Sequence, residues 1–107
     1  MATYVLMTKL GPQLMQDPRG REEVGREWKK RVKKLCPEVK WLTHYALLGP
    51  YDFMDIYETP NPDDALRVSL LCRSSGAVMA ESWAATPYDQ FLSLNQDVED
   101  VIRVKDE

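Results

Sequence analysis

The chain has 107 residues, of which 44% are hydrophobic, and a formal net charge of −3. This length fits one domain with its own core, and the mild negative charge excludes a dedicated nucleic-acid binder, which is usually strongly basic. No apolar run approaches the roughly 18 residues that cross a membrane, and the N-terminus lacks the regions of a signal peptide. We therefore expect a cytoplasmic protein with reduced thiols and no membrane partner.

The sequence predicts four strands and three helices, with a short helical turn after the first strand. Gly11-Pro12 ends the first strand, and Gly49-Pro50 separates the second strand from the third, which makes these two a hairpin. The strands are expected at residues 2–9, 38–48, 51–59 and 77–85. The helices are expected at residues 18–35, 62–74 and 87–95, and the short turn at 12–16.

Each predicted helix begins with a capping residue followed by proline, which is preorganised for the first helical position. These pairs are Asp17-Pro18, Asn61-Pro62 and Thr86-Pro87. In the first helix, apolar residues recur at spacings of four, four and three, which predicts one buried face. The residues of this stripe are Val24, Trp28, Val32 and Leu35. Pro37 should end the helix at Cys36, and Gly76 should cap the second helix in the left-handed conformation.

The order βαββαβ predicts an α+β ferredoxin-like sandwich. Its antiparallel sheet has the strand order 4-1-3-2, two helices cover one face, and a short third helix follows. The strand at 51–59 carries large apolar groups on both faces, with Met54 and Ile56 on one and Phe53 and Tyr57 on the other. A face that helices leave uncovered is normally polar. We therefore expect the open sheet face to pack on a second copy in a homodimer.

Charge is distributed unevenly along the chain. Residues 19–34 hold eight basic and three acidic side chains, a local charge of +5, whereas residues 97–107 hold five acids and two bases. The basic helix face is expected to be solvated, or to bind an acidic partner such as the tail of a second subunit. The apolar residues of the tail fit a helix extension or an added strand, and we favour an extended conformation. The expected domain is 1–96, followed by an acidic extension over 97–107.

Three segments resemble the GYD domain family. Residues 45–60, with Gly49, Tyr51 and Asp52, resemble the signature from which the family takes its name. Residues 1–10 and 81–86 are similar to the family's first strand and to its last strand with the following helix cap. The resemblance implies a fold similar to the dimeric α+β barrels, in which two sheets pack face to face. It brings no catalytic residue, and Gly76-Ala77 stands where many relatives carry Gly-His.

Two polar residues of the predicted hairpin are candidates for proton chemistry. His44 is the only histidine, so any imidazole chemistry must use it, although strand histidines are more often structural. Asp52 follows the turn, where its carboxylate can accept backbone N–H groups or serve as a general base. Of these two roles for Asp52 we favour the turn.

Two further acids lie on apolar strand faces. Asp55 and Glu81 alternate with large apolar residues, so burying either of them is costly unless it is paired or hydrogen-bonded. The expected partner is an arginine such as Arg67 or Arg73, or a group across a dimer interface. A buried carboxylate with a raised pKa would also be a candidate acid or base.

Aromatic residues and the small residues of the last strand predict a small apolar or aromatic ligand pocket. Its expected lining residues are Tyr45, Tyr51, Asp55 and Trp83. The chain has no nucleotide loop, no Cys/His metal cluster and no nucleophile motif, so we expect no cofactor and no metal. The acids in the strand at 51–59 would repel phosphate, which argues against RNA binding by its aromatic residues.

The leading hypothesis for function is a homodimeric enzyme with one small pocket in each subunit. It would resemble the cofactor-free monooxygenases and isomerases that use this barrel, with His44, Asp52 or Glu81 handling protons. The alternative is a non-catalytic module that senses a ligand or binds another protein.

Overall fold

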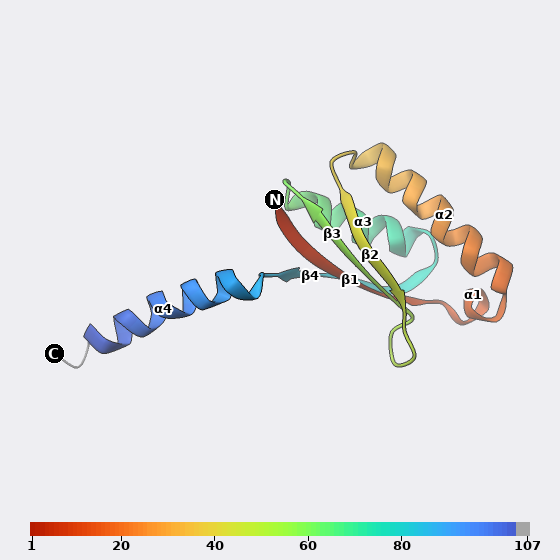
Figure 1. The fold of residues 1–107 in the computed structure, drawn as a ribbon. Helices are drawn as coiled ribbons and strands as arrows, with labels where there is room; N and C mark the ends of the chain where they lie inside the picture. The colour runs from red at the N-terminus through yellow and green to blue at the C-terminus, as the bar shows by residue number, and fades with distance from the viewer. Residues whose placement is uncertain (105–107) are drawn as a thin grey trace.

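The computed structural model describes residues 1–104 as one sheet, two covering helices and a long C-terminal helix (Figure 1). It confirms the predicted α+β class and the order of the elements. The strands are β1 (Ala2–Leu10), β2 (Lys40–Ala46), β3 (Phe53–Thr59) and β4 (Ala77–Ala85). The helices are α1 (Pro12–Gln16), α2 (Pro18–Leu35), α3 (Asp63–Ser74) and α4 (Tyr88–Val104).

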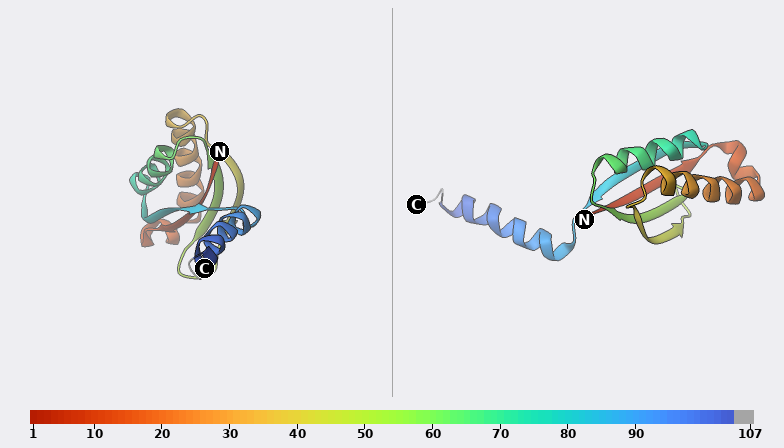
Figure 2. Two further views of the ribbon diagram at one scale, coloured as in Figure 1. Left: turned by 90° about the vertical axis from the view of Figure 1, so that its left-hand side faces the viewer. Right: turned by 90° about the horizontal axis from the view of Figure 1, so that it is seen from above.

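The four strands form one antiparallel sheet in the order β2-β3-β1-β4. This is the predicted order 4-1-3-2 read from the other edge. Within residues 1–104, helices α2 and α3 cover one face of the sheet and no helix covers the other, which we call the open face (Figure 2). The predicted ferredoxin-like arrangement is therefore confirmed for the single chain.

The core lies between the sheet and the two covering helices. Its centre is aromatic: the rings of Trp28 and Trp41 lie 5.1 Å apart, and those of Trp41 and Tyr57 5.4 Å apart. Tyr57 and Val32 are completely buried. The predicted stripe on α2 is wrong at its last position, because Leu35 is 54% exposed and Cys36, just past the helix end, takes its place in the core.

The predicted N-cap and first helical residue are confirmed for α2, whereas α3 and α4 begin one residue later than predicted, at Asp63 and Tyr88. Asp17 caps α2 by accepting the N–H of Arg19 at 3.1 Å, and Cys36 is the C-cap before Pro37. Gly76 has a φ of +117°, the left-handed geometry expected after α3. In addition, an alanine at this position would collide with the Leu14 side chain of α1, so glycine also permits close packing there.

A β-bulge in β2 changes which side chains face the core. The register passes from Trp41 opposite Tyr57 to Thr43 opposite Ile56, and Leu42 has no partner in the register. Trp41 and His44 therefore lie on the same, helix-covered face although they are three residues apart. Strict alternation along β2 would place His44 on the same face as Leu42, but the bulge inserts one extra residue and separates the two.

The prediction for the C-terminal segment is wrong. A short helix at 87–95 and an extended tail were expected, but α4 is one uninterrupted helix of 17 residues that passes through the expected domain boundary at residue 96. No glycine or proline follows Pro87, and the pairs Gln96–Asp100 and Glu99–Arg103 are spaced for helical support. Residues 105–107 of the predicted tail lie outside the described residues.

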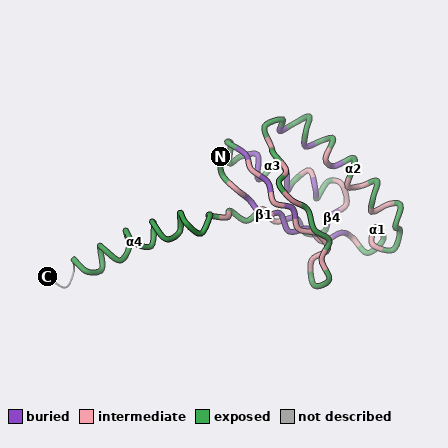
Figure 3. The backbone as a smooth tube through the Cα atoms, in the orientation of Figure 1, coloured by how far each residue is buried: buried purple, intermediate pink, exposed green. Residues whose placement is uncertain are grey.

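Helix α4 projects away from the rest of the molecule (Figures 1 and 2). The longest dimension is 63 Å and the radius of gyration is 17.5 Å, compared with about 13 Å for a compact chain of this length. Figure 3 shows exposed residues along the whole helix.

Candidate functional site

A cavity of about 430 Å³ lies between the first half of α2 and the covered face of the sheet. Small-molecule sites in proteins commonly have volumes of about 300–1,000 Å³. Every strand except β4 contributes to the lining, together with α2 and α3. The lining residues are Thr8, Leu10, Pro18, Arg21, Glu22, Val24, Gly25, Arg26, Trp28, Lys29, His44, Phe53, Asp55, Cys72 and Ser75.

His44 and Asp55 form the principal polar pair of this cavity. They are direct partners across β2 and β3, and Nδ1 of His44 lies 2.5 Å from Oδ1 of Asp55. The Asp55 side chain is 2% exposed, whereas that of His44 is 49% exposed. The carboxylate is therefore fixed inside the protein while the imidazole reaches the solvent-accessible side.

The environment of Asp55 favours protonation more than that of a carboxyl group in water. Burial raises the pKa of Asp55, and the nearby charges of His44 and Lys29 oppose this shift. The His44 ring also stacks on Phe53 at 5.7 Å, which restricts its orientation. In acid–base sites, a buried carboxylate beside a histidine commonly fixes the orientation of the imidazole ring and its tautomer.

The thiol in the cavity wall is not activated. Burial raises the pKa of Cys72 to about 11, and its Sγ lies 3.8 Å from Oγ1 of Thr8. The second free cysteine, Cys36, lies in the core, and burial likewise raises its pKa to about 11. Because the thiolate is the nucleophile, neither cysteine is suited to covalent chemistry at neutral pH.

Asp52 lies in the segment between β2 and β3 and holds that segment against β1. Its Oδ2 accepts the N–H of Leu10 at 2.8 Å, and its own N–H donates to the carbonyl of Thr8 at 2.8 Å. Its carbonyl accepts the N–H of Leu47. These contacts fit the turn role weighed from the sequence, and they place Asp52 outside the cavity lining.

Three of the predicted pocket residues lie on the open face, across the sheet from His44 and Asp55. Tyr51 Oη donates to Glu81 at 3.3 Å, and Trp83 Nε1 donates to the same carboxylate at 3.0 Å. Partial burial and the Glu81 charge raise the pKa of Tyr51. Tyr45 pairs with Met54 on this face and is 54% exposed. The sheet thus divides the predicted pocket set into two groups that do not meet.

The two strand acids, Asp55 and Glu81, do not pair with the arginines that the sequence suggested as their partners. Within the protomer Asp55 pairs with His44, and Glu81 accepts from Tyr51 and Trp83, so neither uses Arg67 or Arg73. The β-bulge explains the first error, because it turns His44 toward Asp55.

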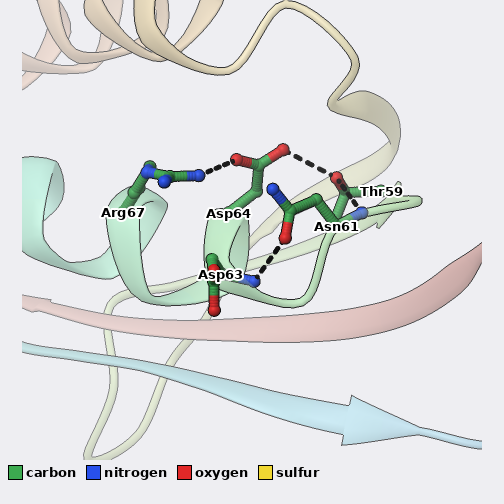
Figure 4. A network of polar contacts seen from close by, with 5 residues as sticks. All are labelled: Thr59, Asn61, Asp63, Asp64 and Arg67. Atoms are coloured by element: carbon green, nitrogen blue, oxygen red, sulfur yellow. Dashed lines mark hydrogen bonds and ion pairs between the residues drawn. The ribbon is translucent and has the colours of Figure 1, made fainter.

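Arg67 belongs instead to a network at the start of α3 (Figure 4). It donates to Oδ1 of the buried Asp64 at 2.9 Å, and Thr59 donates to Oδ2 at 2.9 Å. Asn61 accepts the N–H of Asp63 at 3.0 Å, as expected of a residue that precedes a helix. Burial disfavours the charged form of Asp64, but the hydrogen bonds from Arg67 and Thr59 outweigh it and lower its pKa. This network joins β3 to α3 and is structural.

Within residues 1–104, no three His, Cys, Asp or Glu side chains gather where they could hold a metal ion. None of the helices in this range is long and apolar enough to cross a membrane.

Comparisons with known proteins agree with this fold. A solved structure described as "crystal structure of FFRP-DM1" is 19% identical, with a TM-score of 0.51 over 80% of this chain and 100% of the other. At that identity the likeness concerns the fold alone. No curated protein has a significant sequence match to the chain. The model of the GYD domain matches residues 4–94, which is most of the sequence. The chain therefore belongs to the GYD domain family.

Proposed function

We propose that the protein binds a small molecule with an apolar or aromatic body in the cavity under α2, and that His44 exchanges a proton with it. The observation that carries this proposal is the pairing of the buried Asp55 carboxylate with a half-exposed His44 ring at a cavity of about 430 Å³. Trp28, Val24 and Phe53 supply apolar surface for the body of the molecule.

The pair supports proton transfer in a simple way. With Asp55 ionised, Nδ1 of His44 carries a hydrogen and donates it to Oδ1. Nε2 is then the unprotonated ring atom and can take a proton from a bound molecule and return it at another position. This is the chemistry of an isomerisation, and it requires only the ligand and the His44–Asp55 pair.

Filling the cavity tests this site. Gly25 lines the cavity from α2, and an added Cβ has no atom within 4 Å. We expect Gly25→Leu to keep the fold and to bind the aromatic anion 8-anilinonaphthalene-1-sulfonate at least about tenfold more weakly than the parent chain, about 1.4 kcal/mol. Glu23→Leu is the matched control, because it adds the same side chain on an exposed part of α2 outside the lining. Equal binding by the parent chain and Gly25→Leu would contradict the proposal.

Native mass spectrometry tests the natural ligand. Protein purified from its own host should carry a small molecule that Gly25→Leu loses and that His44→Gln retains. The retained molecule in His44→Gln would then be the substrate rather than the product. If Gly25→Leu retains the molecule, that molecule occupies another site.

The open face favours a second role, self-association. Val5 and Ile56 are neighbours across β1 and β3, and Trp83 lies opposite Val5 on β4. Trp83 is 47% exposed and Tyr45 is 54% exposed. Exposed apolar surface of this kind on a sheet face is typical of a protein–protein contact. We propose that this face packs on the same face of a second copy. Light scattering should give a dimer for the parent chain and a monomer for Ile56→Glu, and a parent chain that is monomeric at micromolar concentration contradicts this role.

A further inference from the structure

No part of the chain that the structure describes, residues 1–104, packs around helix α4. All 17 of its residues are exposed, and none is buried. In proteins, most of the stability of a helix comes from packing one apolar face rather than from the helix propensity of its residues. The helix therefore needs a surface to cover it.

One face of α4 is suited to such packing. Phe91, Leu94, Val98 and Val101 follow one another at spacings of three, four and three, so they form one stripe along the helix. Their exposure ranges from 46% for Phe91 to 73% for Val101. Ser93 lies outside this stripe, about 120° around the helix from its centre.

An apolar groove is present elsewhere on the same chain. It has a volume of about 500 Å³ and runs between α3 and β4, which is an edge strand. Leu66 and Leu70, one helical turn apart, are 64% and 51% exposed on its α3 side. Ala80 and Trp83 line it from β4. An amphipathic helix in an apolar groove is a recurrent mode of protein recognition.

In this structure the helix lies outside the groove of its own protomer. Only Thr86 and Pro87 separate β4 from α4, and α4 continues outward from the end of β4 (Figures 1 and 2). The chain thus presents an unpaired apolar helix and an unpaired apolar groove that two copies can bring together. An exchange in both directions closes into a symmetric dimer and leaves neither surface uncovered.

Charge does not oppose this pairing, because the groove is lined by one basic and one acidic side chain, Arg73 and Glu81. Helix α4 contains four acidic residues and one basic residue. Arg73 lines the groove and is exposed, whereas the groove's carboxylate, Glu81, already accepts hydrogen bonds from Tyr51 and Trp83.

We propose that α4 of each protomer docks, by the stripe from Phe91 to Val101, in the α3–β4 groove of a second copy. This goes beyond the open-face contact proposed above; both contacts need a second copy, and Trp83 lies at the border of the two surfaces.

Two variants separate the helix from the groove. Val98→Glu places a charge in the stripe, and Leu70→Glu places one in the groove; both positions are exposed in the protomer, so its fold should survive. Each variant alone should dimerise at least about tenfold more weakly than the parent chain in sedimentation velocity, about 1.4 kcal/mol. Ser93→Glu adds the same charge to α4 outside the stripe and should leave the dimer unchanged.

Mixing the two variants gives the decisive result. A heterodimer of Val98→Glu and Leu70→Glu retains one intact helix–groove contact, whereas each variant alone has none. Equimolar mixing should therefore restore association to a level between either variant and the parent chain. No gain on mixing, or a Leu70→Glu chain that dimerises like the parent, overturns the proposal and indicates helix–helix pairing instead. A dimer lost in Ile56→Glu but kept in Val98→Glu overturns it while leaving the open-face contact standing.

Discussion

Replacing His44 by alanine should lower the stability of the fold, because it leaves the buried Asp55 carboxylate without a hydrogen-bond partner. In His44→Ala the Asp55 carboxylate keeps its position at 2% exposure but loses its hydrogen-bond partner. A buried polar group left without a partner costs about 1–3 kcal/mol, and more when it is charged. We expect a loss of about 2 kcal/mol at pH 8, which corresponds to a fall of roughly 10 °C in the melting temperature for a domain of this size.

The loss should depend on pH in a defined direction. Burial already raises the pKa of Asp55, and His44 opposes that shift, so removing His44 raises the pKa further. A carboxyl group with a raised pKa in the folded state stabilises the fold fully below its unfolded pKa. That stability is lost as the pH rises through the folded pKa. The difference between the parent chain and His44→Ala should therefore be smaller at pH 5 than at pH 8.

Urea unfolding followed by circular dichroism measures both quantities, at one fixed protein concentration because the chain self-associates in our proposal. Asp55→Asn and the double variant His44→Ala/Asp55→Asn complete the set. In the Asp55→Asn background, replacing His44 by alanine should lower the free energy of unfolding by less than it does in the parent chain. This loss should also no longer grow with pH. A His44→Ala loss that is equal at pH 5 and pH 8, or larger at pH 5, would refute the reasoning.

Three other predictions concern groups outside the cavity chemistry. Asp64→Asn should destabilise the chain by about 2 kcal/mol at pH 7 and less at pH 3 in urea unfolding, because a lowered pKa gives stability that is lost as the pH falls through the folded pKa. Gly76→Ala should cost about 1–3 kcal/mol in thermal unfolding, since the new methyl group meets Leu14 and φ is +117°. Cys36 and Cys72 should resist iodoacetamide at pH 8 in the folded protein and react in urea, because burial raises both pKa values to about 11.

Matched controls accompany these predictions. Gly25→Ala has open space beside the new methyl group and should stabilise α2 by up to about 1 kcal/mol, in contrast to Gly76→Ala. An Asp64→Asn loss of the same size at pH 3 and pH 7 would mean that the charge of Asp64 is not what the network stabilises. Fast labelling of Cys72 in the native state would show that the cavity wall opens readily.

The fold could be predicted because its signals are local. A capping residue followed by proline marks the start of each long helix to within one residue, and glycine marks the end of α3. The order of the elements then allows few topologies. Helix α4 was predicted too short because the apolar residues of its second half were read as a strand. Their spacing from Phe91 through Val101 is helical, and this signal was available in the sequence.

The site was harder to predict because it depends on register. A strict period of two on β2 separates Trp41 from His44, and only the unpaired Leu42 brings both to the covered face. Likewise, Asp55 and Glu81 look equivalent in the sequence but lie on opposite faces of the sheet. Position along a strand identifies a residue's neighbours only after the pairing of that strand is known.

The bulge at Leu42 also affects whether the β2 edge of the sheet can pair with another chain. β2 is an edge strand, and edge strands offer unpaired backbone groups on which further chains can assemble without limit. An irregular register there is a poor template for such growth. At the opposite edge, β4 is regular beyond its first residues, and the docking of a helix from a second copy would occupy that edge. The two edges would thus be protected by different means, one by a defect in the strand and the other by a partner, and assembly would stop at two copies.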